Sequence, residues 1–107
     1  MLENQNLLMT RGDTLSFNLE CVNNMDERIE FDKIFFTCKK NPDDDAIFRK
    51  ELGDGITFED GIYVVRASPE DTAEAEIGKY YYDIKAEIDD DAYTLVRGTL
   101  TIEQNIS

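Results

Sequence analysis

Alternation of apolar and polar residues is the feature that most constrains this chain. From Tyr80 to Ile88 every second residue is apolar or aromatic, and the segment from Leu15 to Cys21 has the same period of two. Successive side chains of a β-strand point to opposite faces, whereas a helical face repeats about every 3.6 residues. The sequence therefore predicts strands that each bury one face.

Turn residues divide these patterns into short segments about ten residues apart, a spacing typical of β-sandwiches and barrels. The strand over 46–52 has the weakest pattern and is expected at a sheet edge. In the last strand the apolar parity slips between Leu95 and Val96, which predicts a bulge near Gly98. The expected strands cover residues 7–9, 15–21, 33–40, 46–52, 56–58, 62–67, 80–88 and 93–102.

One helical turn is expected before the penultimate strand. Ser68 is a favourable N-cap residue, Pro69 suits the first helical position, and two acids follow. The turn should end before Gly78. A short helix or tight loop leading into a tyrosine-bearing strand is typical of the E–F corner of immunoglobulin-like sandwiches. Tyr80 or Tyr82 is expected to form the hydrogen bond across that corner.

Charge and composition exclude several classes of function. The 107 residues include 24 acidic and 11 basic side chains and no histidine, which gives a net charge of −13. A field of that sign repels phosphate backbones, so nucleic acid is not an expected partner. The absence of histidine removes the commonest general base and the commonest neutral metal ligand.

The same composition predicts where the chain folds and how many domains it has. No apolar run reaches the roughly 18 residues of a membrane span, and Met1 to Asn6 lack the features of a signal peptide. We therefore expect synthesis in a reducing bacterial cytoplasm, with no membrane and no cofactor involved. One domain over residues 1–107, with an ordered core at about 7–103, fits this length.

Six motifs in order resemble the small immunoglobulin-like domains of tailed-phage structural proteins. Over Met9 to Ile102 the chain is similar to the N-terminal domain of the baseplate upper protein family. The resemblance implies an antiparallel immunoglobulin-like β-sandwich of about seven or eight strands, with a helical turn before the penultimate strand. It brings no catalytic residue. The motifs are Arg11–Phe17, Asp44–Lys50, Gly53–Ile56, Pro69–Thr72, Gly78–Asp83 and Tyr93–Ile102.

The resemblance implies a non-enzymatic structural or assembly module of a phage or prophage tail or baseplate, localised in the virion. Its partners would be other phage structural proteins, and a homo-oligomeric ring suits a symmetric particle. In the family a receptor-binding or fibre region often follows, and we expect none after Ser107, which favours an adaptor or decoration role. The alternatives are an adhesive or carbohydrate-binding module at the host surface and an acidic cytosolic regulator.

Two aromatic residues are candidates for an interface. Tyr81 has the parity opposite to Tyr80 and Tyr82, and Phe35 has the parity opposite to the buried residues of its strand. Exposed aromatic side chains are enriched at protein interfaces. We expect Tyr81 beside Phe35 or at a contact with a partner.

Two aspartate triplets and two cysteines complete the candidates. Clustered carboxylates are ligands that calcium takes, but the triplets match no EF-hand spacing, and solvated turns are the plainer interpretation. The triplets are Asp43, Asp44, Asp45 and Asp89, Asp90, Asp91.

Cys21 and Cys38 fall on buried parity, so either two apolar thiols or a bridge between them is expected, with the cytosol favouring thiols. Acids confined to turns offer no deep pocket for acid–base catalysis.

Overall fold

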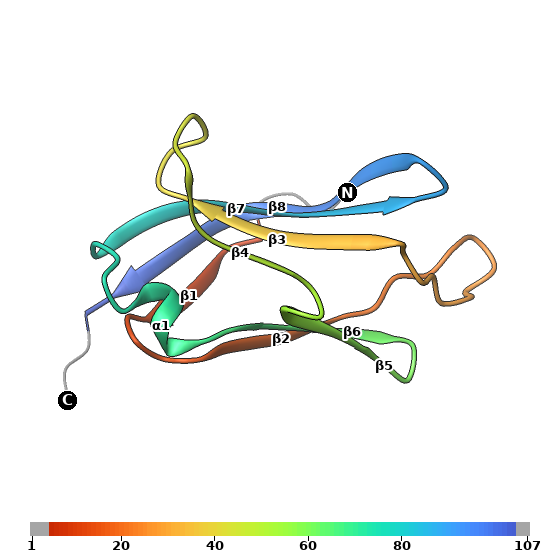
Figure 1. Cartoon of the computed structure of the whole chain (residues 1–107), viewed down its shortest axis with the longest axis horizontal. Helices are drawn as coiled ribbons and strands as arrows, with labels where there is room; N and C mark the ends of the chain where they lie inside the picture. Colours follow the sequence, from red (N-terminus) through yellow and green to blue (C-terminus); the bar gives the residue numbers. More distant parts are fainter. Residues whose placement is uncertain (1–4, 105–107) are drawn as a thin grey trace.

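The computed structural model describes residues 5–104, which form eight strands and one helical turn (Figure 1). Residues 1–4, most of the segment considered for a signal peptide, and 105–107 lie outside the described part. The elements are β1 (Leu7–Thr10), β2 (Leu15–Leu19), β3 (Lys33–Lys39), β4 (Ala46–Leu52), β5 (Gly55–Glu59), β6 (Ile62–Ala67), α1 (Pro69–Thr72), β7 (Gly78–Ile88) and β8 (Asp91–Glu103). The all-β prediction is confirmed.

The strands form one mixed sheet in the order β1-β8-β7-β3-β4-β5-β6-β2. The expectation of a purely antiparallel sheet is wrong at two places, because β1 runs parallel to β8 and β4 runs parallel to β5. β4 and β5 are joined only through the pairs Glu51–Gly55 and Leu52–Ile56. At this narrow joint the sheet folds over, so that β2, β5 and β6 face β3, β7 and β8 around the core in Figure 1.

Alternate residues of β3 and β7 fill the core as their sequence pattern predicts. Ile34, Phe36 and Cys38 of β3 are fully buried. On β7 the inward residues Tyr80 to Ala86 are buried, and only Ile88 is partly exposed. The Phe36 ring lies 5.6, 5.4 and 5.5 Å from the ring centroids of Phe17, Phe48 and Tyr82. All three contacts are edge-on, the favourable geometry for aromatic pairs.

The predicted position of β4 is wrong. Its range Ala46–Leu52 agrees with the sequence, but the strand lies between β3 and β5, and the sheet ends instead at β1 and β2. The apolar pattern of β4 is weak because a lysine, Lys50, occupies an inward position. That lysine is matched by Asp71 of α1, whose carboxylate lies 2.8 Å from the ammonium group.

A bulge interrupts β8 as the parity predicts, but it lies at Leu95 rather than near Gly98. Ile84 of β7 pairs with Val96 and Lys85 pairs with Thr94, which leaves Leu95 as the extra residue. Gly98 has a different role. A Cβ at this position would overlap the backbone carbonyl of Gln5, so a glycine is needed where the N-terminal segment crosses β8.

The helical turn α1 begins at Pro69 after Ser68, as predicted, and ends well before Gly78. Asp71 Oδ2 accepts hydrogen bonds from Ser68 N at 2.7 Å and Ser68 Oγ at 3.1 Å. Together with the hydrogen bond from Asp71 N to the Ser68 carbonyl at 3.0 Å, these bonds hold the first turn. Among residues 5–104 no helix has the length and apolar character needed to cross a membrane.

Candidate functional site

The outward-facing side chains of β3, β4, β7 and β8 form a broad surface, called here the outer face. Paired residues of neighbouring strands point to the same side of a sheet, so the strand registers place these side chains in rows. Three rows cross the four strands. They are Ala46–Lys39–Tyr81–Thr99, Arg49–Thr37–Asp83–Arg97 and Glu51–Phe35–Lys85–Thr94.

Both predicted interface aromatics lie on the outer face, but they are not neighbours. Tyr81 pairs with Lys39, whereas Phe35 pairs with Lys85, and the row of Thr37 and Asp83 separates them. Tyr81 is 40% exposed, while Phe35 is only partly exposed. The sequence predicted the face of each residue correctly but not the row, because the register of two strands is a tertiary property.

Cations cover the two rings to different degrees. The Arg49 guanidinium lies 4.2 Å from the centroid of Phe35, which is close enough for a cation–π contact. The ammonium group of Lys79 lies 5.7 Å from the centroid of Tyr81, near the limit of such contacts. Tyr81 is therefore the more available aromatic on this face.

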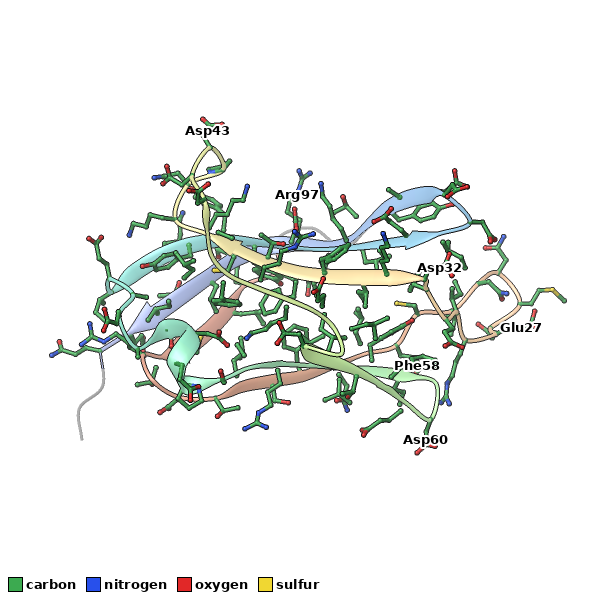
Figure 2. All side chains as sticks on the ribbon, viewed as in Figure 1. Glu27, Asp32, Asp43, Phe58, Asp60 and Arg97 are labelled. Atoms are coloured by element: carbon green, nitrogen blue, oxygen red, sulfur yellow. The ribbon has the colours of Figure 1, made fainter. Side chains whose placement is uncertain are left out.

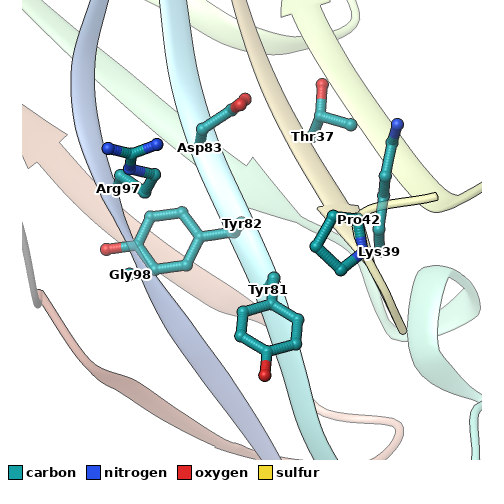
Figure 3. A pocket seen from close by; sticks show the side chains of 8 residues that line it. All are labelled: Thr37, Lys39, Pro42, Tyr81, Tyr82, Asp83, Arg97 and Gly98. Atoms are coloured by element: carbon teal, nitrogen blue, oxygen red, sulfur yellow. The ribbon is translucent and has the colours of Figure 1, made fainter. Parts of the chain in front are cut away.

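A hollow of about 250 Å³ lies beside Tyr81, and we call it the Tyr81 hollow (Figure 3). Its wall combines an aromatic ring, two cations, a carboxylate and a hydroxyl group. This combination suits a polar ligand or a polar side chain of a partner better than an apolar one. The side chains that define it are those of Thr37, Lys39, Pro42, Tyr81, Asp83 and Arg97.

Basic residues concentrate on the outer face of an otherwise acidic chain. Two further outward rows cross β7, one through Lys79 and Thr101 and one through Lys33, Glu87 and Ala92. Together the five rows hold six of the 11 basic residues but only three of the 24 acids. Asp44 and Asp45 border one corner, where they line a second hollow of about 360 Å³ together with Lys39 and Arg49. The basic residues are Lys33, Lys39, Arg49, Lys79, Lys85 and Arg97, and the acids are Glu51, Asp83 and Glu87.

The two tyrosines expected at the corner are buried and bind backbone carbonyls. Tyr80 Oη donates to the carbonyl oxygen of Glu76 at 2.8 Å, and Tyr82 Oη donates to that of Gln5 at 2.7 Å. Burial raises the pKa of both hydroxyl groups, so each remains a protonated donor. Gly78 begins β7 at a φ of 142°, a conformation that glycine adopts without strain.

The two aspartate triplets lie in turns at opposite ends of the sheet. One follows β3 close to the start of β7, and the other joins β7 to β8. Asp44 accepts a hydrogen bond from Asn41 Nδ2 at 3.0 Å, and Asp89 and Asp90 have φ values of 51° and 69° as tight-turn residues. Nowhere in residues 5–104 do three acidic or sulfur ligands gather as a metal site. The calcium hypothesis therefore gains no geometric support.

Both cysteines are free thiols. Cys38 is fully buried on β3, and this burial raises its pKa to about 12. Cys21 is half-buried just after β2, and burial raises its pKa as well. A thiol that stays protonated is a poor nucleophile, so both residues act as small apolar side chains.

Within residues 5–104, the carboxyl groups of Glu70 and Asp71 have shifted pKa values, and both shifts are downward. Burial alone would raise the pKa of Asp71, but hydrogen bonds from Lys50 and Ser68 outweigh it and hold the pKa below its usual value. Hydrogen bonding to its own backbone amide, and then to Ser68, lowers the pKa of Glu70. A general acid at neutral pH needs the opposite shift.

A groove at the end of the sheet remote from α1 was not predicted from the sequence. It lies between the β2–β3 loop (20–32) and the β7–β8 hairpin, and its volume is about 660 Å³. We call it the loop groove. The available signal was the alternation of Ile29 and Phe31 with acids in a loop that also carries Val22 and Met25. Its apolar lining consists of Ile29, Phe31, Ile88, Tyr93 and Leu95.

No family model and no curated protein matches the sequence. Solved structures with a similar fold include a proposed glycoside hydrolase from Bacteroides vulgatus, with a TM-score of 0.52 and 17% identity over 92% of this chain and 16% of that chain. The endo-β-1,4-mannanase from Thermotoga petrophila has a TM-score of 0.57 and 10% identity over 91% of this chain and 18% of that chain. The chain spans less than a fifth of either protein, and the likeness is one of fold.

Proposed function

We propose that this chain is an immunoglobulin-like, non-catalytic assembly module that works by protein–protein contact in a phage or prophage virion. Its strand order supports the immunoglobulin-like assignment. In such sandwiches strands D, E and B share one sheet, and strands G, F, C and C′ share the other. The runs β5-β6-β2 and β8-β7-β3-β4 follow these two orders, with β1 beside β8.

The corner between β6 and β7 supports the same assignment. α1 occupies this corner, and Tyr80 donates to a carbonyl four residues upstream, which matches the tyrosine corner of these domains. The disulfide of antibody domains is missing, since Cys21 and Cys38 are free. Edge-on packing of Phe36 against Phe17 and Tyr82 occupies the centre instead.

The outer face is the observation that carries the contact function. It is a four-stranded surface with an exposed Tyr81 and an excess of cations, in a chain whose net charge is −13. Tyrosine and arginine are enriched at protein interfaces, and the face carries Tyr81, Arg49 and Arg97, whereas its four lysines belong to a type more common at an interface rim. The downward pKa shifts of Glu70 and Asp71 agree with a role that needs no acid catalyst.

The place in a virion rests on the six sequence motifs that resemble phage tail and baseplate domains. The chain would be made in the bacterial cytoplasm and would bind other phage structural proteins, with a homo-oligomeric ring as one form of assembly. Contacts of modest area suffice in a ring, because several linked contacts raise the effective affinity.

Immunogold labelling of purified particles after prophage induction tests this proposal. We expect label on one part of the particle, such as the tail tip or the tail tube, and none on particles from a deletion strain. Absence of label on any particle would remove the virion role. Labelling of particles that carry Tyr81→Ser then tests the contact face, since this variant should fold but assemble poorly.

A carbohydrate-binding module is the second candidate, and the Tyr81 hollow is the observation that favours it. An exposed ring beside Arg97, Lys39 and Asp83 offers both a stacking surface and hydrogen-bonding groups for a sugar. Two proteins of similar fold are described as a proposed glycoside hydrolase and a mannanase. A glycan array that includes mannan separates the candidates: signal lost in Tyr81→Ala and kept in Tyr93→Ala would favour sugar binding.

The acidic-regulator alternative has less support. A mimic of nucleic acid needs acids aligned along one face, whereas the broadest face of this chain carries most of its cations. The aspartate triplets project from opposite ends of the sheet instead.

A further inference from the structure

The loop groove gathers exposed apolar side chains at one end of the molecule. Of the six large apolar residues that are exposed within residues 5–104, one lines the groove and two more lie in the β2–β3 loop that forms one of its walls. They are Val22 and Met25 of the β2–β3 loop and Tyr93 of β8. Apolar patches on soluble domains mark interaction sites when polar residues surround them.

Hydrogen bonds to three other segments fix the β2–β3 loop, which forms one wall of the groove. Phe31 N donates to the buried Tyr63 Oη at 2.6 Å, and Asp32 N donates to the carbonyl of Glu87 at 2.8 Å. Arg28 Nη1 donates to the carbonyl of Asp60 at 2.7 Å, which fastens the loop to the β5–β6 turn. A site formed in advance loses less conformational entropy on binding.

The rim of the groove is acidic. Figure 2 shows Glu27 and Asp32 at this end of the molecule. Arg28 also lines the groove, and its guanidinium lies 3.7 Å from the Glu20 carboxylate and donates to the Asp60 carbonyl. Lys33 at the start of β3 belongs to the outer face. Glu30 is the acid that lines the groove. The loop and the hairpin on either side carry six more exposed acids, namely Asp26, Glu27, Asp32, Asp89, Asp90 and Asp91.

We propose that the loop groove receives a segment of a partner protein in which an apolar side chain lies next to lysine or arginine. The apolar residue would fill the space lined by Ile29, Phe31 and Tyr93, and the basic residue would face the acidic rim. This inference rests on the proposed contact function and names the chemistry of one partner. The outer face, with its excess of cations, would repel the same segment, so the two surfaces select different partners.

Titration of the ¹⁵N-labelled chain with short peptides tests the proposal. The probe KLKFK should shift the amide signals of Ile29 to Phe31 and of Ile88 to Leu95, with a Kd on the order of 1 mM. The charge-reversed peptide ELEFE and the peptide KSKSK, which lacks apolar residues, should bind about tenfold more weakly. Equal binding of KSKSK and KLKFK, or shifts centred on Tyr81, would overturn the proposal.

Matched variants show which side chains contribute to KLKFK binding. Tyr93→Ser should weaken KLKFK binding about fivefold, and Asp90→Asn with Asp91→Asn should weaken it and reduce its salt dependence. Tyr81→Ser on the outer face and Asp43→Asn with Asp44→Asn at the opposite end should stay within about twofold. If the particles carry no immunogold label but KLKFK shifts the amide signals of the groove, only the virion role is contradicted. If the particles are labelled but KLKFK shifts no signals at the groove, the proposed peptide site is contradicted.

Discussion

The two ends of the sheet differ in how their loops are held and in what they expose. At the α1 end, Thr72 is fully buried and accepts a hydrogen bond from Gly12 N at 3.1 Å, and Lys50 and Asp71 are 13% and 15% exposed in their ion pair. At the loop-groove end, Met25 is 78% exposed and Tyr93 is 49% exposed. The α1 end is fastened by polar contacts between distant segments and exposes Ile77, whereas the other end exposes Val22, Met25 and Tyr93.

The contacts at the α1 end serve stability, and the exposed side chains at the other end are available for binding. Buried hydrogen bonds and a shielded ion pair cost free energy when one partner is removed, so the α1 end has little freedom to vary. Exposed apolar side chains contribute little to folding, and they persist where a partner covers them. Variants at the two ends should therefore separate stability from binding.

The largest effect is expected from Lys50→Met at the α1 end. It leaves the shielded Asp71 carboxylate without its counter-charge, and the free energy of unfolding should fall by about 3 kcal/mol. Urea unfolding followed by circular dichroism measures this loss. Lys33→Met is the matched control, because Lys33 is exposed and should change stability by less than about 0.5 kcal/mol. A loss of under about 1 kcal/mol in Lys50→Met would contradict the interpretation that the shielded ion pair stabilises the α1 end.

Tyr63→Phe should cause the largest loss at the loop-groove end. The substitution removes the hydroxyl that accepts from Phe31 N inside the core, and an unpaired buried amide costs about 1–2 kcal/mol. Hydrogen exchange should also accelerate at Phe31 and its neighbours in the β2–β3 loop. If exchange accelerates equally at Thr72, the two ends are not independent.

The stability that Asp71 contributes at the α1 end should depend on pH. The folded-state pKa of Asp71 lies below its usual value of 3.8, so its ionised form stabilises the fold above about pH 4. This contribution is lost as the pH falls through the folded-state pKa. The stability difference between the wild type and Asp71→Asn should therefore shrink below pH 4 in unfolding curves measured at several pH values. A difference that stays constant with pH would contradict the role of the charge.

Asp89→Asn with Asp90→Gly should raise stability by about 0.5–1 kcal/mol. Both residues have positive φ values in a two-residue hairpin turn, a conformation that Asn-Gly adopts more readily than Asp-Asp. Calorimetry should show a higher Tm, and peptide binding at the loop groove should weaken because two rim charges are lost. An unchanged or lower Tm would show that the aspartates contribute to the turn in another way.

The smallest effect on stability is expected for Met25→Ser. Met25 is largely exposed, so its removal should change the free energy of unfolding by less than about 0.5 kcal/mol. Binding of KLKFK is the more sensitive readout, and a modest loss there would assign Met25 to the partner surface. A large loss of stability would instead show that Met25 packs inside the fold.

The candidate surfaces were only partly predictable from the sequence. Parity placed Tyr81 and Phe35 on the outward side, because side-chain direction in a strand depends on local backbone geometry alone. Their separation by a row depends on the β3–β7 register. The loop groove was not predicted, since its walls come from segments more than 50 residues apart in the chain.

The strands, the inward faces of β3 and β7 and the helical turn after Ser68 were predictable from local residue patterns. These features depend on residues within a few positions of one another, through the period of two and the capping preferences of serine and proline. The interior position of β4, the location of the bulge and the need for glycine at Gly98 depend on contacts between distant segments. β4 pairs with β3 and β5, Leu95 is the extra residue opposite Ile84 and Lys85, and Gln5 crosses Gly98. No local pattern encodes these approaches.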